Sequence, residues 1–312
     1  MKVVFFGNAD FGCKTLEALS LSNSHQVVGV VTNKDKKRGR NLKLLPTPIK
    51  KISKKLNLNI IENDNLNDPD FRTNLQALNA DIFVVIAYKI MPKKIYALPH
   101  YGSINLHASI LPAYKGAAPI QRAIINGEKY TGLSTFFLND SIDSGKLISQ
   151  IKININDEDN FEQVWNNLNE KSSEFVINSL ELVLDNQTNI IRNISVQESF
   201  APKIRKKELN IIWNEPSYKI HNKVRAFSPF PSMYTYLGNK RIKILKTSIS
   251  NYKNTNCRIG EIVVDSNKLL VKCRIGFIEI IKLQPDSKKE MKAIDFINGF
   301  SKLLNQASNA FK

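Results

Sequence analysis

Short apolar runs alternate with helical stretches in the first half of this 312-residue chain. Runs rich in β-branched and aromatic residues predict strands at Lys2 to Phe6, Val27 to Thr32, Leu58 to Ile61, Ile82 to Ala87, Gly102 to Leu106 and Gly132 to Phe137. Helical spacing predicts helices near Phe11 to Leu21 and Asp70 to Leu78. Several of the strands are apolar throughout, which is typical of parallel strands covered on both faces. The order of elements therefore favours an α/β fold, a Rossmann-like parallel sheet with flanking helices.

The second half of the chain changes character after one long helix. Apolar residues three or four apart from Phe161 to Leu184 predict an amphipathic helix that closes the first domain. Residues 185–207 are polar, as expected of a linker laid over a surface. Beyond them, runs separated by turn residues predict an OB-like β-barrel with strands at Arg241 to Lys246, Ile259 to Val264, Leu269 to Cys273 and Gly276 to Leu283, capped by a helix over Met291 to Leu304. We therefore expect a first domain at 1–184, a linker at 185–207 and a barrel domain at 208–312.

Positive charge is unevenly distributed along the chain. The formal net charge is +17; residues 1–200 hold 23 Lys and Arg against 20 Asp and Glu, whereas residues 201–312 hold 22 against 8. A local basic surface attracts polyanions such as nucleic-acid phosphates. The excess in the C-terminal third therefore favours a nucleic-acid partner, although a lysine-rich background composition would give the same numbers.

Several classes of protein are disfavoured by what the sequence lacks. The three cysteines are widely spaced and form no CxxC or Cys/His cluster, so we expect a reducing compartment and no metal. The sequence contains no apolar run of the roughly 18 to 20 residues that span a bilayer, and its apolar opening is too short for a signal peptide. Neither a G-x-x-x-x-G-K-[ST] motif nor a G-x-G loop occurs, so no nucleotide is expected. We predict a cytoplasmic protein that does not bind a membrane.

Two polar residues lie at the end of a predicted strand. Asn105 and His107 are two positions apart, so both side chains emerge on the same face. The carboxyl ends of strands are where open α/β sheets bind ligands. An amide donor beside an imidazole that exchanges a proton suits acyl transfer, although a lone histidine is more often structural. Asp143, in a polar turn after a strand, is a candidate to orient His107, and Asp140 is the competing choice by composition.

A long motif surrounds these residues. It comprises SINLHASILP from Ser103 to Pro112 and GAAPIQR from Gly116 to Arg122, with VFFGNADF at 4–11, VVIAY at 84–88 and IDSG at 142–145 in the same order along the chain. Together these segments resemble the signature of the folate-dependent formyltransferases. The resemblance implies that Asn105, His107 and Asp143 form the catalytic group. It also implies 10-formyltetrahydrofolate as cosubstrate, with no metal and no nucleotide, in a folate site lined by Ser109, Ile110, Leu111, Pro112 and Tyr88.

The C-terminal third resembles one branch of that family. APKIRKKE at 201–208, IIW at 211–213 and RAFSPFP at 225–231 are similar to the barrel of the members that act on methionyl-tRNA. The basic segment from Lys34 to Lys43 is similar to an insertion that those members place against the acceptor stem. The resemblance implies a monomer whose partner is initiator methionyl-tRNA, with tRNA-binding residues at Arg40, Lys37, Arg38, Lys43, Lys206 and Lys207.

Two other functions stay open. The same catalytic residues would serve a formyltransferase with a small acceptor, such as an amino-sugar nucleotide or glycinamide ribonucleotide. A non-enzymatic RNA-binding protein, built from an inactive α/β domain and an oligonucleotide-binding barrel, would share the charge pattern. The role of His107 is also open, because the ring could take the amine proton or, when protonated, stabilise an oxyanion.

Overall fold

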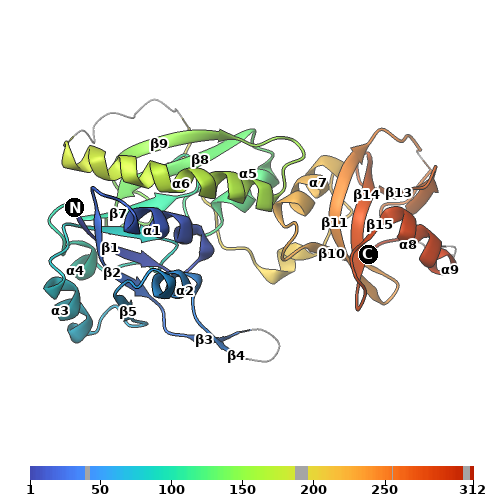
Figure 1. Ribbon diagram of the computed structural model, residues 1–312. Helices are drawn as coiled ribbons and strands as arrows, with labels where there is room; N and C mark the ends of the chain where they lie inside the picture. Colours follow the sequence, from blue (N-terminus) through green and yellow to red (C-terminus); the bar gives the residue numbers. More distant parts are fainter. Residues whose placement is uncertain (39–42, 187–195, 255, 305–309) are drawn as a thin grey trace. The chain divides into compact units, whose positions relative to one another are not determined.

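The computed structural model describes residues 1–38, 43–186, 196–254, 256–304 and 310–312 (Figure 1). Its contacts divide the chain into two compact units. The first unit comprises residues 1–116, 131–153 and 166–200, and the second comprises residues 117–130, 154–165 and 201–312. Two short stretches that precede residue 166 therefore pack with the C-terminal third.

A mixed sheet forms the centre of the first unit. Among the described residues it has seven strands in the order β5-β2-β1-β6-β7-β8-β9, with bounds β1 Lys2–Gly7, β2 Gln26–Thr32, β5 Ile60–Glu62, β6 Ile82–Ile86, β7 Ser103–His107, β8 Tyr130–Phe137 and β9 Leu147–Asn154. The pairings from β5 to β7 are parallel, which confirms the expected α/β sheet. Strand β8 instead runs antiparallel to β7, and β9 was not predicted.

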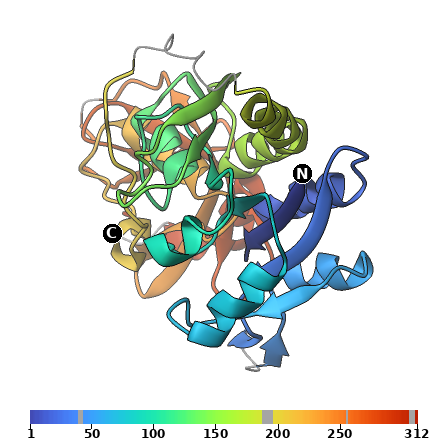
Figure 2. The same cartoon turned by 90° about the vertical axis from the view of Figure 1, so that its left-hand side faces the viewer.

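Helices cover both faces of this sheet (Figures 1 and 2). They are η1 Asp10–Gly12, α1 Cys13–Ser20, α2 Pro48–Lys55, α3 Pro69–Ala77, α4 Lys93–Tyr96 and α6 Phe161–Leu184. Buried side chains of α3 and α4 pack with Phe6 and Phe83 on one face. Hydrogen bonds from Ser172 and Ser179 of α6 to α1 and β8 tie that helix to the first unit. Within the described ranges, no helix has the length and apolarity needed to cross a membrane.

The basic segment that begins at Lys34 contains a small hairpin. Strands β3 (Lys36–Arg38) and β4 (Lys43–Leu45) pair antiparallel, and residues 39–42 between them lie outside the described chain. At its base, the buried Lys50 pairs with Asp35 at 2.5 Å and also with Glu62. These ion pairs hold the residue just before the hairpin close to the end of β5.

The second unit is built on an antiparallel sheet. Its described strands follow the order β10-β11-β14-β13-β12, with β15 beside β14; the bounds are β10 Met233–Leu237, β11 Lys240–Ser250, β12 Ile262–Asp265, β13 Lys268–Lys272, β14 Phe277–Pro285 and β15 Met291–Lys292. The helices are α5 Pro119–Asn126, η2 Lys206–Leu209, α7 Ser217–Ala226, α8 Ala293–Gly299 and α9 Ser301–Leu304. This confirms the expected β domain that follows the α/β domain.

Two expectations for this unit were wrong in detail. The strand expected from Ile259 begins at Ile262, because Gly260 adopts a left-handed turn with φ +82°. The helix expected over Met291 to Leu304 is a short strand followed by two short helices that meet at Phe300. The buried side chains of this segment are Ala293, Phe296 and Leu304, and Ile297 and Phe300 pack against the same core.

The C-terminal residues join the two edges of this sheet. Phe311 pairs with Leu237 at the end of β10, and Ala310 pairs with Glu261 just before β12. A side chain at Gly260 would meet the carbonyl oxygen of Phe311 at 2.5 Å, so the close approach requires glycine there. The pairing closes the sheet, as a barrel requires.

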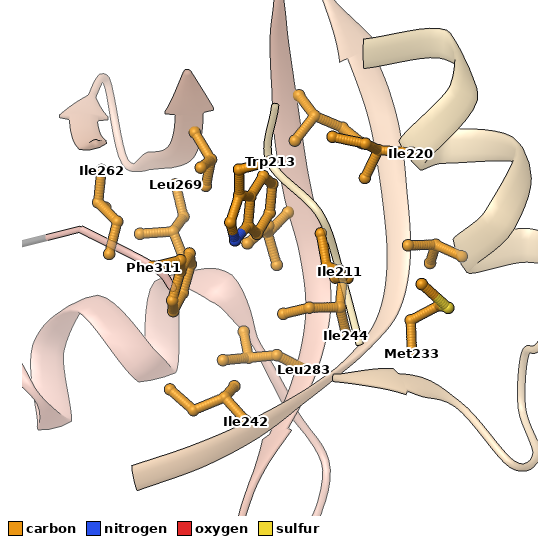
Figure 3. Close-up of a cluster of buried hydrophobic side chains, with 14 of the residues drawn as sticks. Ile211, Trp213, Ile220, Met233, Ile242, Ile244, Ile262, Leu269, Leu283 and Phe311 are labelled. Carbon is orange, nitrogen blue, oxygen red and sulfur yellow. The ribbon is translucent and has the colours of Figure 1, made fainter. Parts of the chain in front are cut away.

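Phe311 also fills the core of the second unit. Its ring stacks on Trp213 with 5.6 Å between ring centroids, and Figure 3 shows both rings among the aliphatic side chains of the cluster. The indole Nε1 of Trp213 donates to Thr235 Oγ1 at 2.9 Å, so its one polar group is satisfied. The last residues of the chain are thus part of the barrel and its core.

We expect Phe311→Ala to destabilise the second unit by about 3–5 kcal/mol, since it removes a buried ring and leaves a cavity. Urea unfolding followed by Trp213 fluorescence, in a Trp165→Phe background, would measure the loss. Phe230→Ala is the matched control because that ring is 78% exposed. If Phe311→Ala and Phe230→Ala unfolded at the same urea concentration, Phe311 would not be part of the core of the second unit.

Candidate active site

Strand β7 presents the two candidate polar side chains of the first unit. Asn105 pairs with Val85 of β6 and with Phe136 of β8, and His107 pairs with Ser134 of β8. Because side chains alternate along a strand, Asn105 and His107 lie on the same face. Asn105 is half-buried, whereas His107 is 7% exposed. The neighbouring strands thus fix the positions of both residues.

Contacts on its two ring nitrogens orient His107. Its Nε2 lies 2.8 Å from the carbonyl oxygen of Tyr114. A carbonyl only accepts, so Nε2 carries the hydrogen and Nδ1 is left to exchange a proton. Nδ1 lies 3.7 Å from Asp143 Oδ2, too far for a direct hydrogen bond but close enough to stabilise a protonated ring.

The loop between β8 and β9 carries Asp143 back toward β7. Its Oδ2 accepts the backbone N–H of Gly116 at 2.8 Å, and its backbone is left-handed with φ 49°. Asp140, the competing candidate, instead accepts the hydroxyl of Tyr96 at 2.7 Å. The geometry therefore brings Asp143, and not Asp140, to His107.

The segment from Ser109 to Pro112 begins two residues after His107. The side chains of Ile110 and Leu111 are buried, and most backbone groups of the segment have hydrogen-bond partners within the protein. Ser134 Oγ donates to the carbonyl of Ser109 at 2.6 Å and accepts the N–H of Leu111 at 3.1 Å. Gln150 Nε2 donates to the carbonyl of Leu111 at 2.8 Å. Two buried polar side chains thus set the path of this segment.

Tyr88 lies just past the carboxyl end of β6, the strand next to β7. Its hydroxyl donates to the carbonyl of Asn63 at 3.4 Å, and its ring packs edge-on against Phe6. Burial, with a smaller contribution from the charge of Asp64, raises the pKa of Tyr88 to about 12. Its hydroxyl therefore stays protonated at neutral pH. Burial also lowers the pKa of the adjacent Lys89, whose Nζ donates to the carbonyl of Asp64 at 2.8 Å.

The basic candidates fall in both units. Lys37 and Lys43 are exposed on the β3–β4 hairpin, and the backbone of Arg38 pairs with Lys43. Arg40 lies outside the described residues. Lys206 and Lys207 are exposed in η2 of the second unit. The hairpin thus groups three of the six candidates on one structural element.

Several groups that hold the site in place could not be identified from the sequence. The carbonyl of Tyr114 and the N–H of Gly116 are backbone atoms, so residue type does not reveal them. Ser134 and Gln150 share their strands with other polar residues, such as Thr135 of β8 and Lys152 of β9, so the sequence does not single them out. In the described part of the chain, no group of three or more His, Cys, Asp or Glu side chains could hold a metal ion.

The arrangement has the components of acyl-group transfer to an amine. A carboxamide can donate to a developing oxyanion, an imidazole has a nitrogen available for proton exchange, and a carboxylate faces that nitrogen. All three come from β7 and from one loop that returns to it.

Comparisons with known proteins agree with this chemistry. A family model described as "Formyl transferase" matches residues 1–180, and one described as "Formyl transferase, C-terminal domain" matches residues 203–301. A "Methionyl-tRNA formyltransferase" of Thermodesulfovibrio yellowstonii is 36% identical over 99% of this chain and 98% of that protein. One from Syntrophomonas wolfei is 32% identical over 96% of each. The crystal structure of WlaRD, "a sugar 3N-formyl transferase", has a TM-score of 0.65 at 21% identity over 93% of this chain and 99% of that one, which shows the shared fold.

Proposed function

This chain belongs to the formyl transferase family, and from that premise we propose that it transfers the formyl group of 10-formyltetrahydrofolate to the amino group of initiator methionyl-tRNA, for initiation of translation. The observation that carries the proposal is the match of both domains, at 36% identity over nearly the whole length, to a protein named for that reaction. The net charge of +14 beyond residue 200 suits a polyanionic acceptor.

In the proposed mechanism, the amino nitrogen of the methionyl group attacks the formyl carbon of the folate. A C–N bond forms, the carbonyl oxygen becomes an oxyanion, and the bond from carbon to the folate nitrogen then breaks. Asn105 donates a hydrogen bond to the oxyanion. His107 takes the amine proton on Nδ1, and Asp143 stabilises the charged ring across the 3.7 Å that separates them. The proton passes to the departing folate nitrogen, so the products are tetrahydrofolate and formylmethionyl-tRNA.

The other residues have proposed roles in binding. Ser109, Ile110, Leu111, Pro112 and Tyr88 would line the folate site beside β7. Residues 1–184 would form the catalytic domain, residues 185–207 the linker and residues 208–312 the tRNA-binding barrel. Arg40, Lys37, Arg38, Lys43, Lys206 and Lys207 would contact tRNA phosphates. We propose a monomer that acts in the cytoplasm, where initiator tRNA is used.

The direct test is formyl transfer by the purified protein. It would be incubated with 10-formyltetrahydrofolate and methionyl initiator tRNA, and formyl incorporation into the methionyl group would be measured. Parallel reactions would offer an amino-sugar nucleotide and glycinamide ribonucleotide as acceptors. Transfer to a small acceptor alone would assign the protein to that branch of the family, and tRNA binding without any transfer would indicate a non-enzymatic RNA-binding protein.

We expect tRNA binding to weaken steeply with salt, because neutralised phosphates release counterions. The Lys37→Gln/Lys43→Gln variant should reduce the slope of log K against log salt by about two, since two phosphate contacts are removed. Fluorescence anisotropy with labelled initiator tRNA would measure it. Lys93→Gln/Lys94→Gln is the matched control, because both lysines are exposed on α4. An unchanged slope in the hairpin variant would remove Lys37 and Lys43 from the proposed interface.

A further inference from the structure

The short segment 198–200 contacts the loop that follows β7. Ser199 uses all three of its polar groups there: its N–H donates to the carbonyl of Pro112 at 3.4 Å, its Oγ accepts the N–H of Tyr114 at 3.0 Å, and its carbonyl accepts the N–H of Lys115 at 2.9 Å. Phe200 adds an isolated parallel bridge to Lys115. This segment lies in the part of the sequence expected to be a linker, yet it packs within the first unit.

Tyr114 links this segment to His107. Its backbone is left-handed, with φ 60°, a conformation that residues other than glycine hold only when their surroundings enforce it. Ser199 Oγ binds its N–H on one side, and His107 Nε2 donates to its carbonyl on the other. Loss of the Ser199 hydroxyl would remove its hydrogen bond to the N–H of Tyr114, a residue that is only 9% exposed, so the peptide would relax and its carbonyl would move.

A second chain of contacts leads to Asp143. The Nζ of Lys115 donates to Glu198 Oε1 at 2.7 Å and to Ser144 Oγ at 2.9 Å, and Ser144 Oγ donates to the carbonyl of Ile142 at 2.9 Å. Asp143 lies between these two loop residues. The carboxylate of Glu198 is 55% exposed, so its ion pair contributes less than the hydrogen bonds of Ser199, which are only partly exposed.

We infer that Ser199 is a positioning residue for formyl transfer, which acts through the Tyr114 carbonyl to keep the hydrogen of His107 on Nε2 and its Nδ1 directed at Asp143. Glu198 and Lys115 support the same geometry from the Asp143 side. The inference rests on the proposed function for its kinetic consequence, but the position of the histidine hydrogen can be measured without catalysis.

The test compares Ser199→Ala with Ser199→Thr in the full-length protein. Thr keeps the hydroxyl and so should behave as wild type. The Ala variant should lose roughly tenfold to a hundredfold in kcat with an unchanged KM for the folate, since misplaced catalytic groups lower the rate more than they lower binding. A purely structural role would lower the melting temperature in both variants or change KM and kcat together, and would overturn the inference.

The second readout is the tautomer of His107. Two-bond ¹H–¹⁵N spectra of histidine-labelled protein, assigned by the signal missing in His107→Gln, should show hydrogen on Nε2 in the wild type and the Thr variant, and a mixture in the Ala variant. Identical spectra for all three proteins would overturn the inference even if formyl transfer occurs. Altered spectra without transfer to methionyl-tRNA would instead count against the proposed acceptor.

A double-mutant cycle tests the contacts of Glu198 and Lys115. Glu198→Gln should slow transfer less than Ser199→Ala does, and in a Lys115→Met background it should have no further effect, because both changes break the same chain of contacts. Additive effects of the two substitutions would remove Glu198 and Lys115 from the proposed positioning network.

Discussion

His107→Ala should lower the rate of formyl transfer by about a hundredfold to ten-thousandfold, the range typical of lost general acid–base catalysis. The reason is geometric. Nε2 of His107 donates a hydrogen bond to the Tyr114 carbonyl, so Nδ1, which faces Asp143, is the nitrogen that can exchange a proton. Single-turnover assays with saturating folate would measure the chemical step rather than product release.

A matched series separates catalysis from folding. In His107→Gln the side-chain amide can still donate to the Tyr114 carbonyl but cannot exchange a proton, so this variant should be folded and as slow as the Ala variant. His100→Ala removes an exposed histidine of the same unit and should be fully active. Near-wild-type transfer by His107→Gln would show that His107 only supports the loop.

The fold was predictable where the pattern of apolar residues is unambiguous. Strand β6 is buried and apolar throughout, and β1 is buried and free of polar side chains after its first residue, the exposed Lys2. Strand β9 was missed, although its alternating burial follows from the alternating residues of LISQIKIN. The hairpin strands β3 and β4 were missed for a physical reason, because each has only three residues, too few to show a period.

The site was predictable only in part. The spacing of Asn105 and His107 already places them on one face, because a strand has a period of two. Whether Asp140 or Asp143 meets His107 could not be decided by composition, since it depends on the path of a loop that turns back along an antiparallel strand. Ser199 is 92 residues from His107 in the sequence, and only the folded chain brings its hydroxyl to the loop that holds the ring.

Asn105→Ala should lower the rate of formyl transfer by about a hundredfold to a thousandfold, the usual cost of losing one oxyanion donor. The carboxamide is half-buried on the face of β7 that carries His107, and Val85 and Phe136 on the neighbouring strands fix its position. The effect should appear in kcat, since the hydrogen bond strengthens as charge develops on the oxygen.

Asn105→Asp is the sharper variant, because it keeps the shape of the side chain and replaces the N–H donor by an acceptor with negative charge. It should be at least as slow as the Ala variant, since a carboxylate beside a developing oxyanion repels it. Asn23→Ala, at an exposed position outside the β8–β9 loop, is the control for the loss of an asparagine side chain. Transfer by Asn105→Asp at the wild-type rate would rule out oxyanion stabilisation by this residue and leave the charged His107 ring as the group that performs it.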